Sequence, residues 1–362
     1  MKILITGATG LIGQQVGKSL VREGHDLTIV TRDAVKARLQ IPFPAEIIEG
    51  DLGKGPIEKL KSLKFDGVIA LAGENVASGR WTEAKKNELR NSRIQMTKNL
   101  AASIKPVEIV ISASGIGYYG DRGEEVLTED SSAGSDFLAQ LCCEWENETA
   151  KVPAVRHLFF RFGVVLSSAG GALEKMLLPF RLALGGKIGT GKQWMSWIHI
   201  DDAINAISFA LKTQSLDGAI NAISPQVVRN VEFTKALAEA IGKPAIFPVP
   251  RLALKMAFGD FSETVIASQR AQPTRLEAAG FEFKYKSISH ALENTLGHLR
   301  SGEEVLVAEQ YLPLKKEALF PFFSDAKNLA KITPPILNFQ ITKVSEGPLK
   351  SGALIEYRLK VH

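Results

Sequence analysis

The sequence predicts an α/β fold, with a Rossmann-type doubly wound parallel sheet and a smaller lobe beside it. Three observations support this. Short β-branched or apolar runs alternate with longer helical stretches from residue 1 to about residue 298. A glycine-rich turn directly follows the first of these runs. Beyond residue 166 the alternation gives way to glycine-rich loops at 167–171 and 185–191, which is typical of a lobe that closes over a sheet.

The runs place six parallel strands along the chain. The expected strands are Lys2 to Thr6, Leu27 to Thr31, Glu46 to Glu49, Gly67 to Leu71, Glu108 to Ser112 and His157 to Phe162. Two helices are expected near 201–212 and 230–241, followed by the segment "GFEFKY" from residue 280. A polar hinge at 299–304 then separates two domains. The first domain is 1–298, with its smaller lobe mainly at 167–298, and the second is 303–362.

Composition excludes several classes of function. The net charge of +5 is spread over 362 residues without a run of five like charges, so no nucleic-acid partner is expected. No apolar stretch approaches the roughly 18 residues of a membrane span. Cys142 and Cys143 are adjacent and form neither a disulfide framework nor a metal site, which favours a reducing, cytoplasmic location. Scattered His, Asp and Glu residues show no metal-ligand spacing. The oligomeric state is not predicted.

The amino terminus carries the strongest motif, "MKILITGATGLIG". Gly7, Gly10 and Gly13 have G-x-x-G-x-x-G spacing between a strand and a helix beginning near Leu11. Such glycines allow a tight turn, close approach of the backbone to a diphosphate, and close packing of helix on strand. Backbone N–H groups at the helix start would then face the diphosphate. The motif predicts nucleotide binding.

The second strand ends in "IVTRD", and its charges indicate which dinucleotide is preferred. An acidic side chain there usually holds the ribose hydroxyls of NAD, whereas an arginine pairs with the additional phosphate of NADP. Arg32 is nearest the strand tip, so NADP(H) is favoured. A shift of one residue in register would give the role to Asp33 and the preference to NAD.

Further motifs reveal a family resemblance. With "GDL" at 50–52, "LAGENV" at 71–76, "SASGIGYYG" at 112–120 and "WMSWIHIDD" at 194–202, residues 1–298 resemble the extended short-chain dehydrogenase/reductase superfamily. The set is most similar to its atypical epimerase-family branch of nucleoside-diphosphate-sugar epimerase-like proteins. The resemblance implies an oxidoreductase or epimerase acting on a small molecule that the sequence does not identify.

The resemblance also implies a set of NADP(H)-binding residues. Around the diphosphate and the 2′-phosphate it places Gly7, Gly10, Leu11, Ile12, Gly13, Thr31 and Arg32. It places Asp51, Leu52, Leu71 and Ala72 around the adenosine and Val165 at the nicotinamide. Glu88 and Arg93 lie on the next helix, from which Arg93 could reach the cofactor, although a solvated helical surface is the alternative role for both.

The catalytic pair of the superfamily is missing. The superfamily uses a tyrosine and, four residues later, a lysine, because an isolated phenol has a pKa of about 10 and needs a neighbouring charge to exchange protons at neutral pH. This chain has Phe137 and Leu141 at those places. The standard mechanism is therefore not expected.

Replacement groups lie in "SASGIGYYG". Counting without a gap puts Gly115 where the superfamily has its substrate-polarising serine, and Ser114 fits with a shift of one residue. Tyr118 and Tyr119 follow the fifth strand, where one phenol could reach the substrate. We predict Ser114, Tyr118 and Tyr119 as the candidate catalytic residues, with packing as the competing role for Tyr119.

Two further motifs have structural interpretations. "GKIGTGKQ" at 186–193 lacks the hydroxyl residue of an ATP-binding phosphate loop, so no ATP site is predicted. In "IHIDD", Asp201 is expected to cap the following helix, and His199 either packs under that turn or contacts a substrate.

The last segment has its own pattern. From Val305 it is expected to form a strand, a helix with Ala318, Leu319, Phe322 and Phe323 on one side, and two strands in "ILNFQITKV" and "GALIEYRLKVH". It resembles the beginning of the polyketide cyclase/START-like family, a partial α+β helix-grip fold.

Three hypotheses of function remain open. The first is an NADP(H)-dependent oxidoreductase or epimerase with an atypical site. The second, favoured by Phe137 and Leu141, is a non-catalytic NADPH-binding sensor or scaffold. The third is a carrier of a hydrophobic ligand through the last segment.

Overall fold

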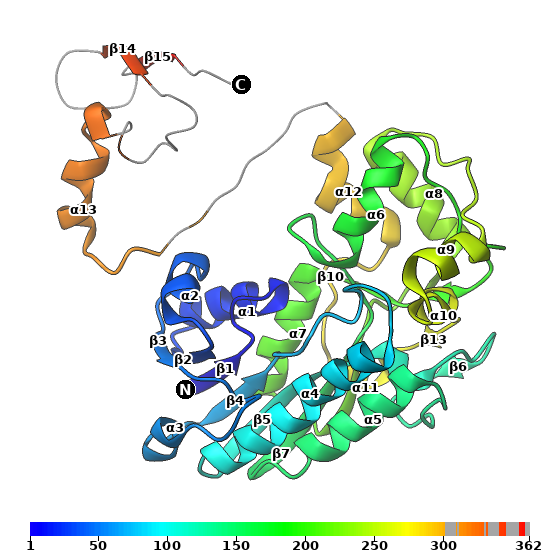
Figure 1. The fold of residues 1–362 in the computed structure, drawn as a ribbon, viewed down its shortest axis with the longest axis horizontal. Coiled ribbons are helices and arrows are strands. Elements are labelled where there is room, and N and C mark those ends of the chain that lie inside the picture. Colours follow the sequence, from blue (N-terminus) through cyan, green and yellow to red (C-terminus); the bar gives the residue numbers. More distant parts are fainter. Residues whose placement is uncertain (301–308, 310, 329–330, 332–339, 345–354, 359–362) are drawn as a thin grey trace. The chain divides into compact units, whose positions relative to one another are not determined.

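The computed structural model describes residues 1–300, 309, 311–328, 331, 340–344 and 355–358 (Figure 1). The chain divides into two compact units, Met1–Gln310 and Tyr311–His362, which are described separately.

The first unit is built on a seven-stranded sheet of order β3-β2-β1-β4-β5-β7-β11, in which all neighbours are parallel. Its strands are β1 (Lys2–Thr6), β2 (Asp26–Thr31), β3 (Glu46–Glu49), β4 (Gly67–Ala70), β5 (Val107–Gly115), β7 (Ala154–Phe162) and β11 (Gly218–Ala222). The six predicted strands are all present, and the Rossmann-type fold is confirmed. The seventh, β11, has the sequence "GAINA", whose small residues give little strand signal.

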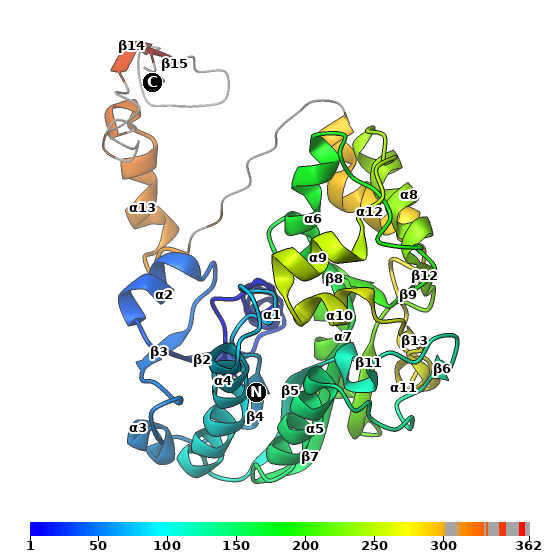
Figure 2. The ribbon, with the colours of Figure 1, turned by 45° about the vertical axis from the view of Figure 1, so that its right-hand side comes forward.

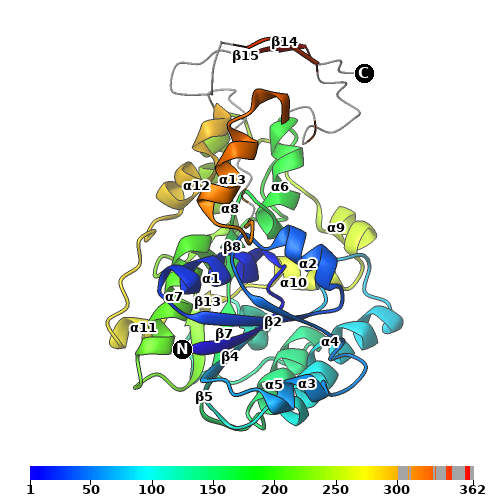
Figure 3. The same cartoon turned by 90° about the vertical axis from the view of Figure 1, so that its left-hand side faces the viewer.

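Helices cover both faces of the sheet (Figures 2 and 3). On one face α1 (Leu11–Arg22) and α7 (Ile200–Lys212) pack on Ile3 and Ile5. On the other, α3 (Glu58–Ser62) and α4 (Glu83–Ser103) pack on Leu4. This division follows from the alternation of side chains along a strand. The remaining helices beside the sheet are α2 (Ala34–Gln40) and α5 (Phe137–Thr149), and α5 packs along α4.

The smaller lobe has its own apolar core. Its helices are α6 (Gly171–Arg181), α8 (Asn230–Ile241), α9 (Arg251–Phe258), α10 (Phe261–Ile266), α11 (Thr274–Ala278) and α12 (Ile288–Leu296). Short strand pairs brace it: β8 (Val164–Leu166) with β10 (Trp197–His199), β9 (Trp194–Met195) with β12 (Val228–Arg229), and β6 (Val126–Leu127) with β13 (Arg270–Ala271). Short 3-10 helices lie at η1 (Ile116–Tyr119) and η2 (Gly297–Arg300). The two predicted helices correspond to α7 and α8.

The segment "GFEFKY" joins the lobe to the sheet. Phe281 and Phe283 belong to the core under the sheet, whereas Tyr285 belongs to the core of the lobe. The buried Asp202 carboxylate, on α7, accepts hydrogen bonds from the backbone N–H groups of Lys284 and Tyr285 at 2.8 and 2.9 Å. These two hydrogen bonds hold the segment 284–285 against α7.

The cap of α7 differs from the prediction. His199 rather than Asp201 caps the helix, because its Nδ1 accepts from the Asp201 backbone N–H at 3.1 Å. The His199 ring is buried and lies against Tyr285, with 3.7 Å between ring centroids. Asp201 instead pairs with Lys284 at 3.3 Å. His199 therefore has the packing role weighed for it above.

The second unit contains α13 (Lys316–Phe323), η3 (Ala326–Asn328) and an antiparallel pair, β14 (Gln340–Val344) with β15 (Ile355–Arg358). These match the expected helix and final two strands. The strand expected from Val305 lies outside the described residues, and the helix-grip resemblance stays a prediction. Among the helices the structure describes, none is long and apolar enough to cross a membrane.

The buried His199 makes stability depend on pH. Burial lowers the pKa of His199 from 6.5 to about 4, so the folded chain holds the neutral ring while the unfolded chain takes up a proton first as the pH falls. We therefore expect the contribution of this ring to be complete above pH 6.5 and to be lost progressively down to about pH 4. Denaturant unfolding of the wild type and of His199→Asn, which retains a capping side chain, measures this. Parallel free-energy curves across that pH range would contradict it.

Candidate functional site

The glycine turn after β1 packs tightly between β4 and α1. Gly7 has a φ of +74°, and a Cβ there would lie 2.7 Å from the backbone nitrogen of Ala72. A Cβ on Gly13 would collide with the Gly7 carbonyl oxygen, so only glycine lets α1 approach β1 this closely. Gly10 occupies the N-cap of α1 without a side-chain cap, which leaves backbone N–H groups of the first turn available to an anion.

A cavity of about 760 Å³ opens beside this turn, at the carboxyl ends of β1, β2 and β4. Among the residues predicted to bind the cofactor, those lining it are Gly7, Gly10, Thr31, Arg32, Asp51, Leu52, Leu71, Ala72 and Glu88. Residues that the prediction did not include also line it, among them Lys54, Asn87, Asn91 and Ser92. Asn87, Asn91 and Ser92 share the face of α4 that bears Glu88, so helical periodicity could have indicated them.

The other predicted cofactor residues lie outside this lining. Gly13 packs against Gly7, and Ile12 packs partly buried against the core. Leu11 lies against the start of α6, where a Cβ on Gly171 would be 3.2 Å from Leu11 Cδ2. Val165 pairs with Ile198 between β8 and β10.

Arg93 supports the wall of the cavity from behind. Its Nη2 donates to the Glu74 carbonyl oxygen at 2.9 Å, and its Nη1 donates to that of Leu89 at 3.1 Å. The guanidinium carbon lies 5.0 Å from the ring centroid of Trp145, and burial lowers the pKa of Arg93. Arg93 therefore fixes the 72–76 loop and is not itself among the lining residues.

The structure separates the roles of Arg32 and Asp33. Arg32 is exposed, lines the cavity, and forms no ion pair with a described residue. Asp33 instead caps α2, with Oδ1 accepting from the Lys36 backbone N–H at 2.8 Å. The shift of one residue that would place Asp33 at the cavity does not occur. Arg32 lines the cavity, and Asp33 caps the next helix.

An apolar cluster fills the place of the missing catalytic pair. Leu141 is fully buried with Leu89 and Trp81, and Phe137 packs edge-to-face on Trp81 with 5.2 Å between centroids. The Trp81 Nε1 donates to the Val76 carbonyl oxygen at 2.8 Å, which ties the cluster to the cavity wall. In this region of α5 the structure offers packing where the superfamily has a phenol and an ammonium group.

A second cavity, of about 540 Å³, lies beside Phe137. Its lining combines aromatic side chains with ionisable ones: Trp81, Phe137, Lys86, Asp121, Asp136, Asp260 and Glu263. Lys86 Nζ pairs with Asp260 at 3.0 Å and lies 5.7 Å from the Phe137 ring centroid. Titratable groups therefore surround the position where the superfamily carries its phenol.

One guanidinium, that of Arg161 on β7, ties the three predicted catalytic residues together. Its Nε and Nη2 donate to the Glu146 carboxylate at 2.9 and 2.7 Å, and its Nη1 donates to the Tyr119 hydroxyl at 2.9 Å. Ser114 also donates to Glu146, at 2.7 Å. The Tyr118 ring centroid lies 3.4 Å from the guanidinium carbon. Sequence reasoning missed Glu146 and Arg161, which carry no motif of their own.

Burial and bonding limit what these candidates can do. Tyr119 has no exposed surface, and its hydroxyl donates to Asn221 Oδ1 at 2.8 Å, which fits the packing role that the sequence leaves open beside the catalytic one. The Ser114 proton is directed at Glu146, which differs from a serine that polarises a substrate by donating to it. Tyr118 is half-buried, and burial raises the pKa of its phenol. Burial also raises the pKa of the Cys142 thiol to about 11, so this thiol is not a ready nucleophile.

The chain is similar to known proteins in both sequence and fold. Residues 3–222, more than half of the chain, match the NAD dependent epimerase/dehydratase family, and residues 249–295 match a domain of unknown function, DUF1731. The chain is 38% identical to an epimerase family protein of Mycobacterium bovis over 295 residues, which cover 80% of this chain and 96% of that protein.

Two further relatives extend the comparison. A chloroplastic SDR39U1 homolog of Arabidopsis thaliana is 38% identical, over 81% of this chain and 86% of that protein. The crystal structure of human epimerase family protein SDR39U1 (isoform 2) with NADPH is 32% identical and has a TM-score of 0.73, covering 82% of this chain and 99% of that chain. The glycine turn, the parallel sheet and these matches together show that the chain belongs to the NAD dependent epimerase/dehydratase family.

Proposed function

We propose that this chain binds a nicotinamide dinucleotide in the 760 Å³ cavity and prefers NADP(H) to NAD(H). The main support for this preference is the arrangement after β2, where Arg32 lines the cavity and Asp33 caps α2. A guanidinium with no ion pair among the described residues favours a phosphate, whereas a carboxylate would favour the free ribose hydroxyls. The NADPH in the human SDR39U1 structure supports the same preference.

The residues at the cavity fit the parts of this cofactor. The backbone of Gly7–Gly10 and the start of α1 would hold the diphosphate, and Thr31 and Arg32 the 2′-phosphate. Asp51, Leu52, Leu71 and Ala72 would enclose the adenosine. A bound nicotinamide would supply hydride transfer, and this chain's part is to orient it and to manage the accompanying proton.

We further propose that the 540 Å³ cavity beside Phe137 holds the substrate of an oxidoreductase or epimerase. Its ionisable lining supports catalysis, because protons can be exchanged there without a phenol at position 137. The alternative is a non-catalytic NADPH sensor or scaffold, supported by the apolar cluster at Phe137 and Leu141. A cytoplasmic location stays a prediction, consistent with the free thiols of Cys142 and Cys143.

Arg32 provides the test of cofactor preference. In Arg32→Ala we expect NADPH affinity to fall by roughly 1.5–3 kcal/mol, or about ten- to hundredfold, because a charge-assisted contact to the 2′-phosphate is lost. NADH affinity should stay nearly unchanged. Calorimetric titration of both cofactors measures this, with Arg38→Ala, a basic residue outside the cavity lining, as the matched control. Equal losses for NADPH and NADH would refute the assignment of Arg32.

Turnover separates the enzyme from the sensor. The protein with NADPH is incubated with a panel of carbonyl compounds, and NADPH absorbance is followed. We expect oxidation by at least one compound that depends on the second cavity, so Lys86→Gln should lower its rate while NADPH affinity is retained. Saturable NADPH binding with no oxidation by any compound would favour the sensor and leave the cofactor assignment intact.

Tyr119 tests whether the polar network is structural. Removing its hydroxyl in Tyr119→Phe leaves Arg161 Nη1 and Asn221 short of a buried partner, so we expect a loss of about 1–3 kcal/mol in unfolding free energy. NADPH affinity and any NADPH oxidation should be retained at a temperature where the variant is folded. Loss of oxidation without loss of stability would instead make the phenol a reacting group.

A further inference from the structure

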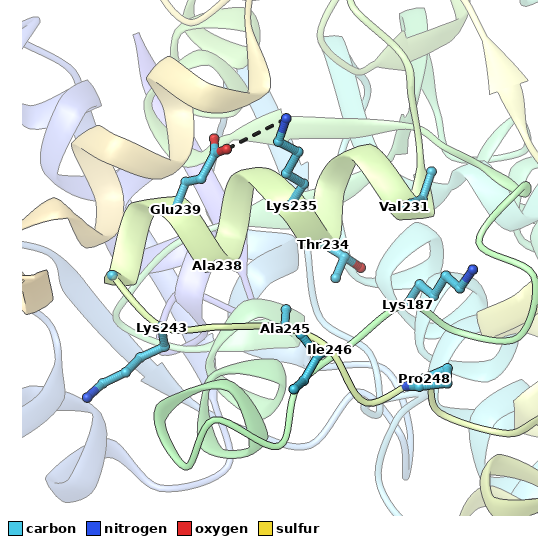
Figure 4. A pocket seen from close by; sticks show the side chains of 11 residues that line it. Lys187, Val231, Thr234, Lys235, Ala238, Glu239, Lys243, Ala245, Ile246 and Pro248 are labelled. Carbon is cyan, nitrogen blue, oxygen red and sulfur yellow. Dashed lines mark ion pairs between the residues drawn. The ribbon is translucent and has the colours of Figure 1, made fainter.

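A groove of about 460 Å³ lies on the lobe, apart from both cavities described above. It runs along α8 and is closed on its other side by the segment 243–248 and by Lys187 (Figure 4). The apolar side chains that line it are Val231, Ala238, Ala245, Ile246 and Pro248. No residue of this groove lines either of the other cavities.

The charges of the groove are predominantly positive. Three lysines and one glutamate line it, and Lys235 pairs with that glutamate, Glu239, at 3.9 Å. Lys187 and Lys243 form no ion pair with any residue that the structure describes. Figure 4 shows these two lysines at opposite ends of the groove, with their side chains directed away from each other. A complementary ligand therefore carries an anionic group at each end.

The wall formed by 243–248 has exposed apolar side chains and two backbone N–H groups without a partner among the described residues. Ile246, which lines the groove, is 70% exposed, and its neighbour Phe247, outside the lining, is 51% exposed. Within the described residues, the backbone N–H groups of Ala245 and Ile246 have no hydrogen-bond acceptor. By contrast, the N–H groups of Phe247 and Val249 donate to Gly185 and Lys187. A ligand that offers carbonyl groups as well as apolar side chains matches this wall, and a peptide does so.

The length of the groove sets the length of the ligand. The 12 residues of α8 extend about 18 Å at 1.5 Å per residue. An extended peptide covers that distance with about five or six residues at roughly 3.3 Å each. We propose that this groove docks a short extended segment of a partner protein, apolar in its middle and acidic at both ends. This interaction does not depend on the proposed dinucleotide binding.

A labelled peptide tests the proposal with the full-length protein. The probe is an acetylated hexapeptide of sequence Glu-Glu-Leu-Val-Leu-Glu, and its binding is followed by fluorescence anisotropy. Reversing both end charges in Lys187→Glu/Lys243→Glu should weaken binding at least about tenfold, because opposite-charge contacts become repulsive. The same double variant should gain affinity for the peptide with lysines in place of the glutamates. Added salt should weaken the wild-type interaction.

Controls separate the groove from general surface effects. Lys105→Glu changes an exposed lysine elsewhere and should leave peptide affinity unchanged. Ile246→Ser should weaken binding, whereas Val155→Ser, at a side chain with 74% exposure on β7, should not. Acidic-peptide affinity that is unchanged by the Lys187/Lys243 reversal would overturn the proposal. Binding of the fatty acid laurate without any binding of the peptide would equally overturn it in favour of a lipid ligand.

Discussion

The close packing of the glycine turn on its neighbours is the constraint on which the cofactor cavity depends. Gly7 sits against the backbone at the end of β4, and Gly13 sits against the carbonyl oxygen of Gly7. With side chains at either position, α1 would move away from β1, and the start of the helix would no longer lie beside the cavity. The carboxyl ends of β1, β2 and β4 then meet around one space because the sheet is parallel.

The proposed site combines a conventional cofactor half with an unconventional substrate half. In the cofactor half, backbone and short side chains form the walls, and Arg93 braces the 72–76 loop from behind. In the substrate half, α5 presents Phe137 and Leu141 to an aromatic cluster with Trp81. Ionisable side chains lie instead at two other places: in the lining of the second cavity and in the buried hydrogen-bond network around Arg161.

Much of the fold was predictable from sequence because its signals are local. β-branched runs identified six strands, and the glycine spacing identified the turn and α1. The strand β11 was missed because "GAINA" has few β-branched residues, and its place at the sheet edge is set by pairing with β7. The cap of α7 was assigned to Asp201 because aspartate is a common cap, whereas packing on Tyr285 holds His199 there instead.

The proposed substrate side was less predictable because its interactions are non-local. Ser114 meets Glu146 across 32 residues, and Tyr119 meets Asn221 across 102. Neither pair has a characteristic spacing, and a phenol shortly after a strand looks the same in sequence whether it faces a ligand or a buried amide. Arg32 and Asp33 illustrate the same limit, since only the observed helix cap decides which of the two neighbours faces the cavity.

The path of residues 281–285 has a consequence for motion. Two phenylalanines of this segment are embedded beneath the sheet while Tyr285 is embedded in the lobe, and Asp202 bonds the chain between them. The lobe is thus held to the sheet by buried packing on both sides of this segment, and not by a single flexible linker. Hinge-bending of the whole lobe would break this buried packing, so we expect motion on this side of the molecule to be confined to surface loops and short helices.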